Sequence, residues 1–466
     1  MIKDLPSKQE DVLSKYSDAI KDIDAIKVTG RVERVVGLTI ESLGPPVSYG
    51  DICRIKLDNS KFLPAEVVGF NQNRIILMPI GSMTGVVPGA PVHASGSKLV
   101  IPVSPYMLGR VISGTGEPID GKGPFRLAQN YPVDSHSVNP LLRAPIDKPL
   151  SVGIRAIDGL ITVGRGQRIG IFAGSGVGKS TLIGMIARYT DSDVNVIALI
   201  GERGREVKDF ITKELGEEGL KRSVVVVATS DMPPLVRLHG AAVAHAIAGY
   251  FRDQGLSVNL LMDSITRYAE AQREVGLSAG EPAATRGYPP SVFSMIPRLI
   301  ERAGTAENGG SITGFYSVLV EGDDMNDPIA DSARGRLDGH IVLDRDLAHK
   351  GHYPAIDVLA SISRCMKDVV SAEHLAAAEK FRKLLAAYSK VESLFDFGGY
   401  VKGSNQDADK AIQLKPDMDS FLIQGIYEKE LFRSTVSRLE SMFAEKRMSM
   451  AMANAARPPA FVQIVR

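Results

Sequence analysis

Five short apolar runs mark the middle of the chain, and stretches with helical spacing separate them. The runs are RIGIF (168–172), VNVIALIG (194–201), SVVVVA (223–228), SVNLLMD (257–263) and ITGFYSVLV (312–320). Continuous apolar runs of this length, without alternating polar positions, are typical of parallel strands buried on both faces. Residues 152–364 are therefore predicted to form an α/β domain in which helices cover a largely parallel sheet.

The segments before and after this α/β domain have different residue patterns. Short β-like runs broken by Gly, Pro and Asn predict a small β-barrel, and a Pro- and Gly-rich passage after it, with GRVISGTGEPIDGKGPF and NPLLRAPIDKPL, is expected to be a linker wrapped on a surface. After Ser371 the chain is rich in Ala, Lys, Glu and Leu, which predicts a helical C-terminal domain. The barrel runs are 32–40, 52–57, 65–70 and 74–78, and the expected domains are an N-terminal segment (1–26), the barrel (27–102), the α/β domain with its linker (103–370) and the helical domain (371–466).

The N-terminal segment has the pattern of a short amphipathic helix. Residues 7–10 (SKQE) have capping-box spacing, and Leu13, Tyr16, Ile20 and Ile23 then recur at helical intervals. Such a helix either packs on its own domain or docks on a partner protein, and the pattern leaves both open.

Net charge, cysteine and histidine spacing and the N-terminal sequence exclude several classes of protein. The chain has 466 residues with a net charge of +1, so no global field marks a nucleic-acid binder, and we predict no nucleic-acid partner. The two cysteines, Cys53 and Cys365, lie outside any CxxC spacing, and the histidines lack metal-ligand spacing. The N-terminus is too charged for a signal peptide and no apolar run could span a bilayer, so a cytoplasmic location is expected.

A phosphate-binding loop follows the first apolar run of the α/β domain. Glycines there let successive backbone N–H groups surround phosphate oxygens, the helix that starts near Lys179 points its positive end at them, and the Ser180 hydroxyl can ligate magnesium. The pattern is the relaxed form of the motif, because it begins with alanine. The predicted nucleotide-binding residues are Ala173, Gly174, Ser175, Gly176, Val177, Gly178, Lys179, Ser180 and Thr181.

Two carboxylates stand where a nucleotide-hydrolysing sheet needs them. Asp263 ends the run LLMD, the position of an aspartate that holds magnesium through water, although it could also cap the following helix. Glu202 follows VNVIALIG, where it could polarise water for attack on the γ-phosphate. Taken alone, Glu202 could equally begin a surface helix.

Several longer segments resemble one family throughout. LITVGRGQRIGIFAGSGVGKST, LIGERGREVKDF, MDSITRYAEAQREV, GEPAATRGYPPSVF, EGDDMNDPIADSARGRLDGHIVL and GHYPAIDVLASISR closely resemble the flagellum-specific ATPases of the type III export apparatus, from about residue 30 to 364. That family is similar to the catalytic subunit of rotary ATP synthases. The resemblance implies a β-barrel, a RecA-like core and a helical C-terminal domain, with ATP and Mg²⁺ as ligands. One departure is GEPA at 280–283 where the family usually has GEPP.

The resemblance also assigns roles to individual residues. It makes Glu202 the catalytic glutamate, places Arg203 near the γ-phosphate and makes Arg364 an arginine finger that acts across a subunit boundary. Tyr353 matches the aromatic ring that packs on adenine, and Phe395 is placed on its other face. Lys179 and Ser180 match the phosphate and magnesium residues, and Asp263 the magnesium-holding carboxylate.

The presence of both Glu202 and Arg364 in one chain favours a homohexamer with six competent interfaces. The resemblance further implies a stator-like regulatory protein that binds the N-terminus, a central stalk protein, export chaperones, flagellar substrates and a membrane export gate, with the enzyme peripheral to the inner membrane at the flagellar base. The expected function is ATP hydrolysis that drives flagellar protein export through chaperone release and substrate unfolding or delivery. Alternatives are a virulence-type secretion ATPase, an RNA-translocating hexamer and a nucleotide-binding subunit that does not hydrolyse.

Overall fold

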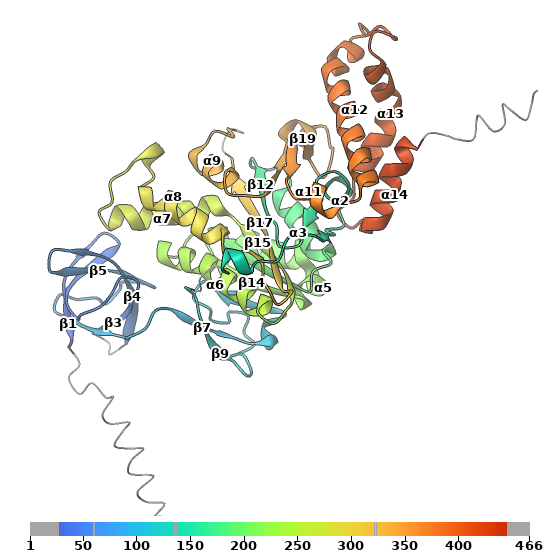
Figure 1. Cartoon of the computed structure of the whole chain (residues 1–466). Helices are drawn as coiled ribbons and strands as arrows, with labels where there is room; N and C mark the ends of the chain where they lie inside the picture. Colours follow the sequence, from blue (N-terminus) through green and yellow to red (C-terminus); the bar gives the residue numbers. More distant parts are fainter. Residues whose placement is uncertain (1–27, 59–60, 135–137, 321, 323, 445–466) are drawn as a thin grey trace, which may run out of the picture. The chain divides into compact units, whose positions relative to one another are not determined.

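The computed structural model describes residues 28–58, 61–134, 138–320, 322 and 324–444, and these form two compact units, residues up to 99 and residues from 100 onward (Figure 1). The predicted amphipathic helix in residues 1–26 lies outside the described residues. Within the described ranges, no helix is long and apolar enough to cross a membrane.

The first unit is a closed six-stranded barrel with the strand order β1-β2-β5-β4-β3-β6. Alternate side chains point inward, and Ile40, Ile55, Leu77 and Val92 are completely buried. The predicted single run 32–40 is wrong in one respect, because Gly37 adopts a φ of 55° and turns the chain into a hairpin. The strands are β1 (Gly30–Val36), β2 (Thr39–Leu43), β3 (Ile52–Lys56), β4 (Phe62–Asn71), β5 (Arg74–Pro79) and β6 (Pro91–Ala94).

The second unit contains a nine-stranded sheet with the order β19-β18-β12-β17-β15-β13-β14-β8, and β16 pairs at the side of β17. The strands from β18 to β8 are parallel, while β19 and β16 run antiparallel to their neighbours. All five predicted core runs are strands. Their bounds are β8 (Arg110–Ser113), β12 (Arg168–Ala173), β13 (Val194–Ile200), β14 (Ser223–Ala228), β15 (Ser257–Asp263), β16 (Gly304–Thr305), β17 (Ser311–Leu319), β18 (Gly339–Leu343) and β19 (Ile356–Ser363).

Part of the expected surface linker belongs to this sheet. β8 pairs in parallel with β14, and its Arg110 forms a bidentate ion pair with Asp120 at 2.6 and 2.9 Å. The prediction of a linker wrapped on a surface was therefore wrong for residues 110–113, which form a strand of the sheet. Four further short strands form two separate two-stranded sheets: β7 (Val100–Val103) pairs with β9 (Gln129–Pro132), and β10 (Pro149–Leu150) pairs with β11 (Val163–Gly164).

Helices cover the sheet, and a helical segment follows it as predicted. In Figure 1, α12, α13 and α14 pack side by side after the sheet. The helices are α2 (Arg155–Leu160), α3 (Lys179–Tyr189), α4 (Gly204–Asp209), the π-helix η3 (Phe210–Leu215), α5 (Gly216–Lys221), α6 (Pro234–Arg252), α7 (Ile265–Ser278), α8 (Pro290–Ile300), α9 (Pro328–Arg334), α10 (Arg345–His349), α11 (Met366–Val369), α12 (Ala372–Asp396), α13 (Gln406–Leu422) and α14 (Phe432–Phe443), with short 3-10 turns η1 (Pro105–Met107), η2 (Pro140–Leu142) and η4 (Thr285–Gly287).

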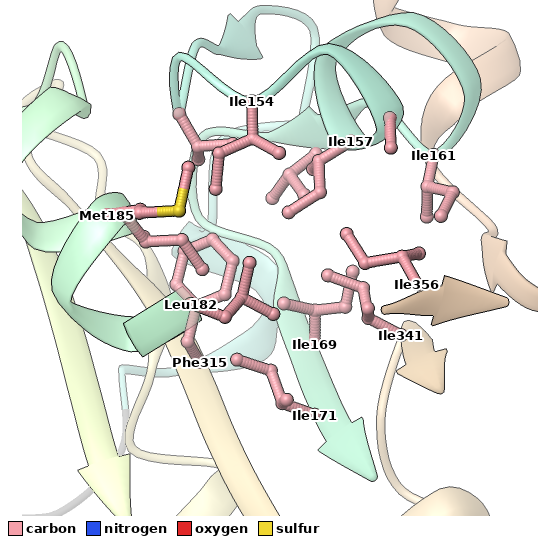
Figure 2. Packing of buried hydrophobic residues seen from close by; sticks show 14 of the residues in the cluster. Ile154, Ile157, Ile161, Ile169, Ile171, Leu182, Met185, Phe315, Ile341 and Ile356 are labelled. Atoms are coloured by element: carbon pink, nitrogen blue, oxygen red, sulfur yellow. The ribbon is translucent and has the colours of Figure 1, made fainter. Parts of the chain in front are cut away.

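One continuous hydrophobic core supports the strand that leads to the phosphate loop. Figure 2 shows Ile169 and Ile171 of β12 facing Ile157 of α2 and Leu182 of α3. Full burial of such a side chain stabilises the fold by about 1.5–3 kcal/mol, so β12 and α3 are fixed to each other by packing on both sides of the loop. The loop between them consequently starts and ends on rigid elements.

Candidate nucleotide site

The phosphate loop connects the end of β12 at Ala173 to the start of α3 at Lys179. Gly176 and Gly178 have φ values of 82° and 92°, a backbone region that side chains disfavour, so glycine is needed at both positions to fold the loop back over the helix N-terminus. Ser175, Gly176 and Ser180 are exposed. The first N–H groups of a helix have no partner within it, so a turn of this kind with exposed hydroxyls beside it can bind an anion. Phosphate binding by this loop stays a prediction.

Lys179 lies between the two predicted carboxylates. Its Nζ is 2.5 Å from Oδ1 of Asp263 and 3.7 Å from Oε1 of Glu202. Asp263 is the last residue of β15 and Glu202 follows β13 by two residues, so parallel strand ends bring both to the same sheet edge as the loop. The sequence-predicted cluster is thus assembled in one place.

Burial and neighbouring carboxylates raise the pKa of Glu202. Desolvation, followed by the nearby Asp263, raises the pKa of Glu202 to about 7, although Lys179 opposes the shift, and a side-chain hydrogen bond with Glu206 also favours the protonated form. The same hydrogen bond lowers the pKa of Glu206. Glu202 is therefore a carboxyl group that titrates near neutrality, the range in which a side chain can accept a proton from water.

Arg203 contacts Glu206, the hydrogen-bond partner of Glu202, and is largely exposed. Its guanidinium donates to Oε1 of Glu206 at 3.0 Å, and the side chain is 81% exposed. The role near the γ-phosphate stays a prediction, and it would require Arg203 to leave Glu206.

The Tyr353 ring stands beside the phosphate loop. A methyl group placed on Gly178 would lie 3.6 Å from Cε1 of Tyr353, and the ring is 44% exposed. The Tyr353 carbonyl accepts a hydrogen bond from the backbone N–H of Gln424, 2.9 Å away, just after α13. Phe395 falls near the end of α12, and its side chain lies outside the described residues.

Arg364 is not part of this cluster. It follows β19, which runs antiparallel to β18, and Gly339 at the start of β18 is paired with Ser363. Ala173 of the phosphate loop pairs instead with Leu343 at the other end of β18. Arg364 and the loop therefore lie at opposite edges of one sheet, and Arg364 is exposed.

Three residues that contact the predicted site residues were not predicted from the sequence. Ser317 of β17 donates to Oδ1 of Asp263 at 2.6 Å, Glu206 bonds Glu202, and Glu214 accepts from the Thr181 hydroxyl at 3.2 Å. Ser317 is a polar residue near the C-terminal end of a largely apolar strand, and this position could have indicated a role at the site. The two glutamates carried none, because they are ordinary residues of a charged helical surface.

Oxygen donors suited to a divalent cation are present at the loop. The Ser180 hydroxyl is exposed, and Asp263 supplies a carboxylate whose negative charge is neutralised here by the Lys179 ammonium. Within the described residues no ready-made group of three or more His, Cys, Asp or Glu side chains could hold a metal ion by itself. That donor set suits a cation that arrives with phosphate and keeps several waters.

Family comparisons agree with this fold. Residues 153–363 match the nucleotide-binding domain of the ATP synthase alpha/beta family, residues 32–96 match its β-barrel domain, and residues 370–441 match the T3SS EscN ATPase C-terminal domain. The molecule is thus a P-loop ATPase of the ATP synthase alpha/beta class, with the predicted barrel, α/β core and helical C-terminus.

Relatives narrow the class further. The chain is 54% identical over 427 residues to the "Flagellum-specific ATP synthase" of Bacillus subtilis (91% of this chain, 97% of the relative) and 50% identical over 444 residues to that of Salmonella typhimurium (92% and 97%). A "Type 3 secretion system ATPase" of Xanthomonas euvesicatoria is 50% identical over 414 residues (89% and 93%). The assembled ATPase EscN of enteropathogenic E. coli superposes with a TM-score of 0.84 at 45% identity, covering 89% of this chain and 99% of EscN. The chain belongs to the family of flagellum-specific ATP synthases and is an ATP-hydrolysing, ATP-binding enzyme.

Proposed function

We propose that this enzyme hydrolyses Mg²⁺-bound ATP at the interfaces of a homohexamer, and that hydrolysis energises export of flagellar proteins through the type III export apparatus. The observation that carries the proposal is the contact of Lys179 with both Asp263 and Glu202 directly after the phosphate loop. A nucleotide-binding subunit without hydrolysis would not need Glu202, whose raised pKa suits a proton acceptor.

Each residue has a defined task in this mechanism. The loop N–H groups and Lys179 would bind the β- and γ-phosphates, which requires Lys179 to exchange its carboxylate partners for phosphate oxygens. Ser180 and, through water, Asp263 would hold Mg²⁺, which neutralises phosphate charge. Glu202 would orient the attacking water and accept its proton. Tyr353 would pack on adenine, with Phe395 proposed on the opposite face.

The position of Arg364 supports a ring. Because Arg364 lies at the sheet edge opposite its own loop, it can reach a γ-phosphate only in a neighbouring subunit. There its guanidinium would stabilise charge that develops on the transferred phosphoryl group, and Arg203 would do so from within the subunit.

Partners follow from the same family membership. EscN has been solved in complex with its central stalk EscO. We propose a corresponding stalk for this chain, together with a stator-like regulator, export chaperones, flagellar substrates and the membrane export gate, on the cytoplasmic side of the inner membrane at the flagellar base. A virulence-type secretion role is the second candidate, because the 50% identity to a type 3 secretion system ATPase nearly equals that to the flagellar relatives.

Glu202→Gln and Lys179→Ala separate binding from chemistry. We expect Lys179→Ala to abolish tight ATP binding, whereas Glu202→Gln retains binding and loses hydrolysis by about two to four orders of magnitude. Nucleotide affinity and phosphate release measure the two effects, and the exposed Glu217→Gln is the matched control. A Glu202→Gln enzyme that hydrolyses ATP at the parent rate would refute the catalytic assignment.

The export role needs a test in the cell. Replacing the chromosomal gene by the Glu202→Gln form should stop secretion of flagellar proteins into the medium, while Glu217→Gln should leave it intact. Loss of virulence effectors with normal flagella would move the assignment to the second candidate.

A further inference from the structure

Gln167, the residue before β12, makes four hydrogen bonds with its side-chain amide and is completely buried. Oε1 accepts from the Gly164 N–H at 2.8 Å and from the Ser363 hydroxyl at 3.2 Å. Nε2 donates to the Asp338 carbonyl at 3.1 Å and to Ser363 Oγ at 3.0 Å. An amide has two donors and two acceptor lone pairs, so its bonding capacity is filled.

Three of these bonds join Gln167 to Asp338 and Ser363, and these two residues fix the backbone of Arg364. The Asp338 carbonyl that accepts from Gln167 also accepts from the Arg364 N–H at 2.9 Å. Asp338 is itself fixed, because its carboxylate accepts from the N–H and Nε of Arg168, both at 3.0 Å. At Gly339 an added methyl group would come within 2.4 Å of the Ile362 carbonyl, so β18 and β19 approach each other closely at this point.

The guanidinium of Arg364 has no such support. It is exposed, and it forms no ion pair with the residues that the structure describes. The direction of the Arg364 side chain therefore depends on the position of its backbone. Contacts with Gln167, Asp338 and Ser363 fix that position.

We propose that Gln167 is a positioning residue for hydrolysis in the adjacent subunit, because it fixes the Ser363–Arg364 segment. This inference rests on the proposed role of Arg364 as a finger acting in trans. Gln167 directly precedes β12, and the phosphate loop follows the other end of the same strand, so each subunit would carry the residue that fixes the finger and the loop at opposite ends of β12.

Two enzymatic measurements test the assignment in the full-length enzyme. A displacement of about 1 Å in a catalytic group can lower the rate by roughly 10²-fold, so Gln167→Leu should lower kcat by about that factor and leave ATP affinity within about twofold. In an Arg364→Ala background the same change should cause no further loss, because there is no longer a finger to aim. The matched control is Gln272→Leu, another buried glutamine, which bonds Ser291 on α8 at 2.9 Å.

Mixed rings separate action on the neighbour from action on the subunit's own loop. When Gln167→Leu subunits are mixed with Glu202→Gln subunits, hydrolysis should return where an intact Glu202 meets an intact Arg364 anchor. The same recovery is expected for Arg364→Ala mixed with Glu202→Gln. If Arg364→Ala mixtures recover and Gln167→Leu mixtures do not, Gln167 acts on its own loop and this proposal fails. If Arg364→Ala leaves kcat unchanged, the finger role itself fails.

A folding defect is distinguished by a milder variant. Ser363→Ala removes only the hydroxyl shared with Gln167 and should show the same split between kcat and ATP affinity with a smaller loss. Normal kcat in Ser363→Ala and in a folded Gln167→Leu would overturn the proposal.

Discussion

The surroundings of Glu202 raise its pKa to about 7, close to neutral pH. Its pKa of about 7 lies above the ordinary value of 4.5, so the folded protein binds this proton more tightly than the unfolded chain does. Ionisation of Glu202 therefore lowers stability progressively as pH rises from about 4.5 to about 7. In the proposed mechanism Glu202 is the carboxyl group that accepts the proton of the attacking water.

The activity of the enzyme should follow this titration. We expect kcat/KM for ATP to rise with pH along an acid limb near pH 7, because the free enzyme needs ionised Glu202. Glu206→Gln removes a neighbouring negative charge that disfavours ionisation, so the limb should move to lower pH. Steady-state rates between pH 5.5 and 9 check this, with Glu217→Gln as control. An unmoved limb would show that Glu206 does not influence Glu202.

At the scale of single residues, the sequence is informative where chemistry coincides with strand ends. Lys179 and Asp263 could be predicted from their places after a glycine-rich loop and at the end of an apolar run, because parallel strands bring such positions to one edge of the sheet. The pattern around Glu202 fitted a surface helix start equally well, so the family resemblance was needed to assign it. Arg364 could be assigned only through family resemblance, since nothing in its local pattern distinguishes it from a surface arginine. Ser317 and Glu206 act through contacts that depend on strand register and helix placement.

Among the elements, α2 joins the C-terminal helices to the core. Its buried Arg155 donates to the carbonyls of Phe421 and Ile423 and pairs with Glu428 and Glu430. Gln424 returns the contact, donating to the Gly153 carbonyl at 2.8 Å. The loop after α13 thereby contacts α2 through the Arg155 side chain and Tyr353 through one backbone hydrogen bond from the Gln424 N–H.

Removing the Arg155 side chain should weaken the contact between α2 and the loop after α13. Arg155→Met leaves the carbonyls of Phe421 and Ile423 without their donor and removes two ion pairs, so we expect the free energy of unfolding to fall by about 2–4 kcal/mol. Denaturant unfolding measures it. Arg165→Met is the matched control, because Arg165 pairs with the half-exposed Asp191, and surface pairs contribute about 0–1 kcal/mol. Equal losses in the two variants would contradict the role of Arg155.

Strands with long apolar runs could be predicted from the sequence, and a short strand among Gly and Pro could not. β13, β14 and β15 are buried on both faces, so their apolar runs match the strands almost residue for residue. β8 is only four residues long and sits among Gly and Pro, and its pairing with β14 is a long-range event that leaves no local pattern.

For the whole molecule, the N-terminal segment is proposed to bind the regulator without contributing to catalysis. Deleting residues 1–26 should leave ATP hydrolysis intact but abolish co-purification with the regulator and reduce motility, because terminal amphipathic helices dock through such a stripe. Leu13→Asp with Ile20→Asp should act alike. A truncated enzyme that melts much lower yet still binds the regulator would show that the helix packs on its own domain.

The opposite placement of the phosphate loop and Arg364 on one sheet has a statistical consequence in cells that make two versions of the chain. Under the proposed ring, a competent interface needs an intact Glu202 from one subunit and an intact Arg364 from the next. Random mixing with equal amounts of a Glu202→Gln chain should leave about half of the interfaces competent, whereas a chain that carries Glu202→Gln and Arg364→Ala together should leave about a quarter. The double variant should therefore be the more strongly dominant of the two, although each is equally inactive alone. Motility and ATPase activity in co-expressing cells measure this dominance, and equal suppression by the two would mean that each subunit completes its own site.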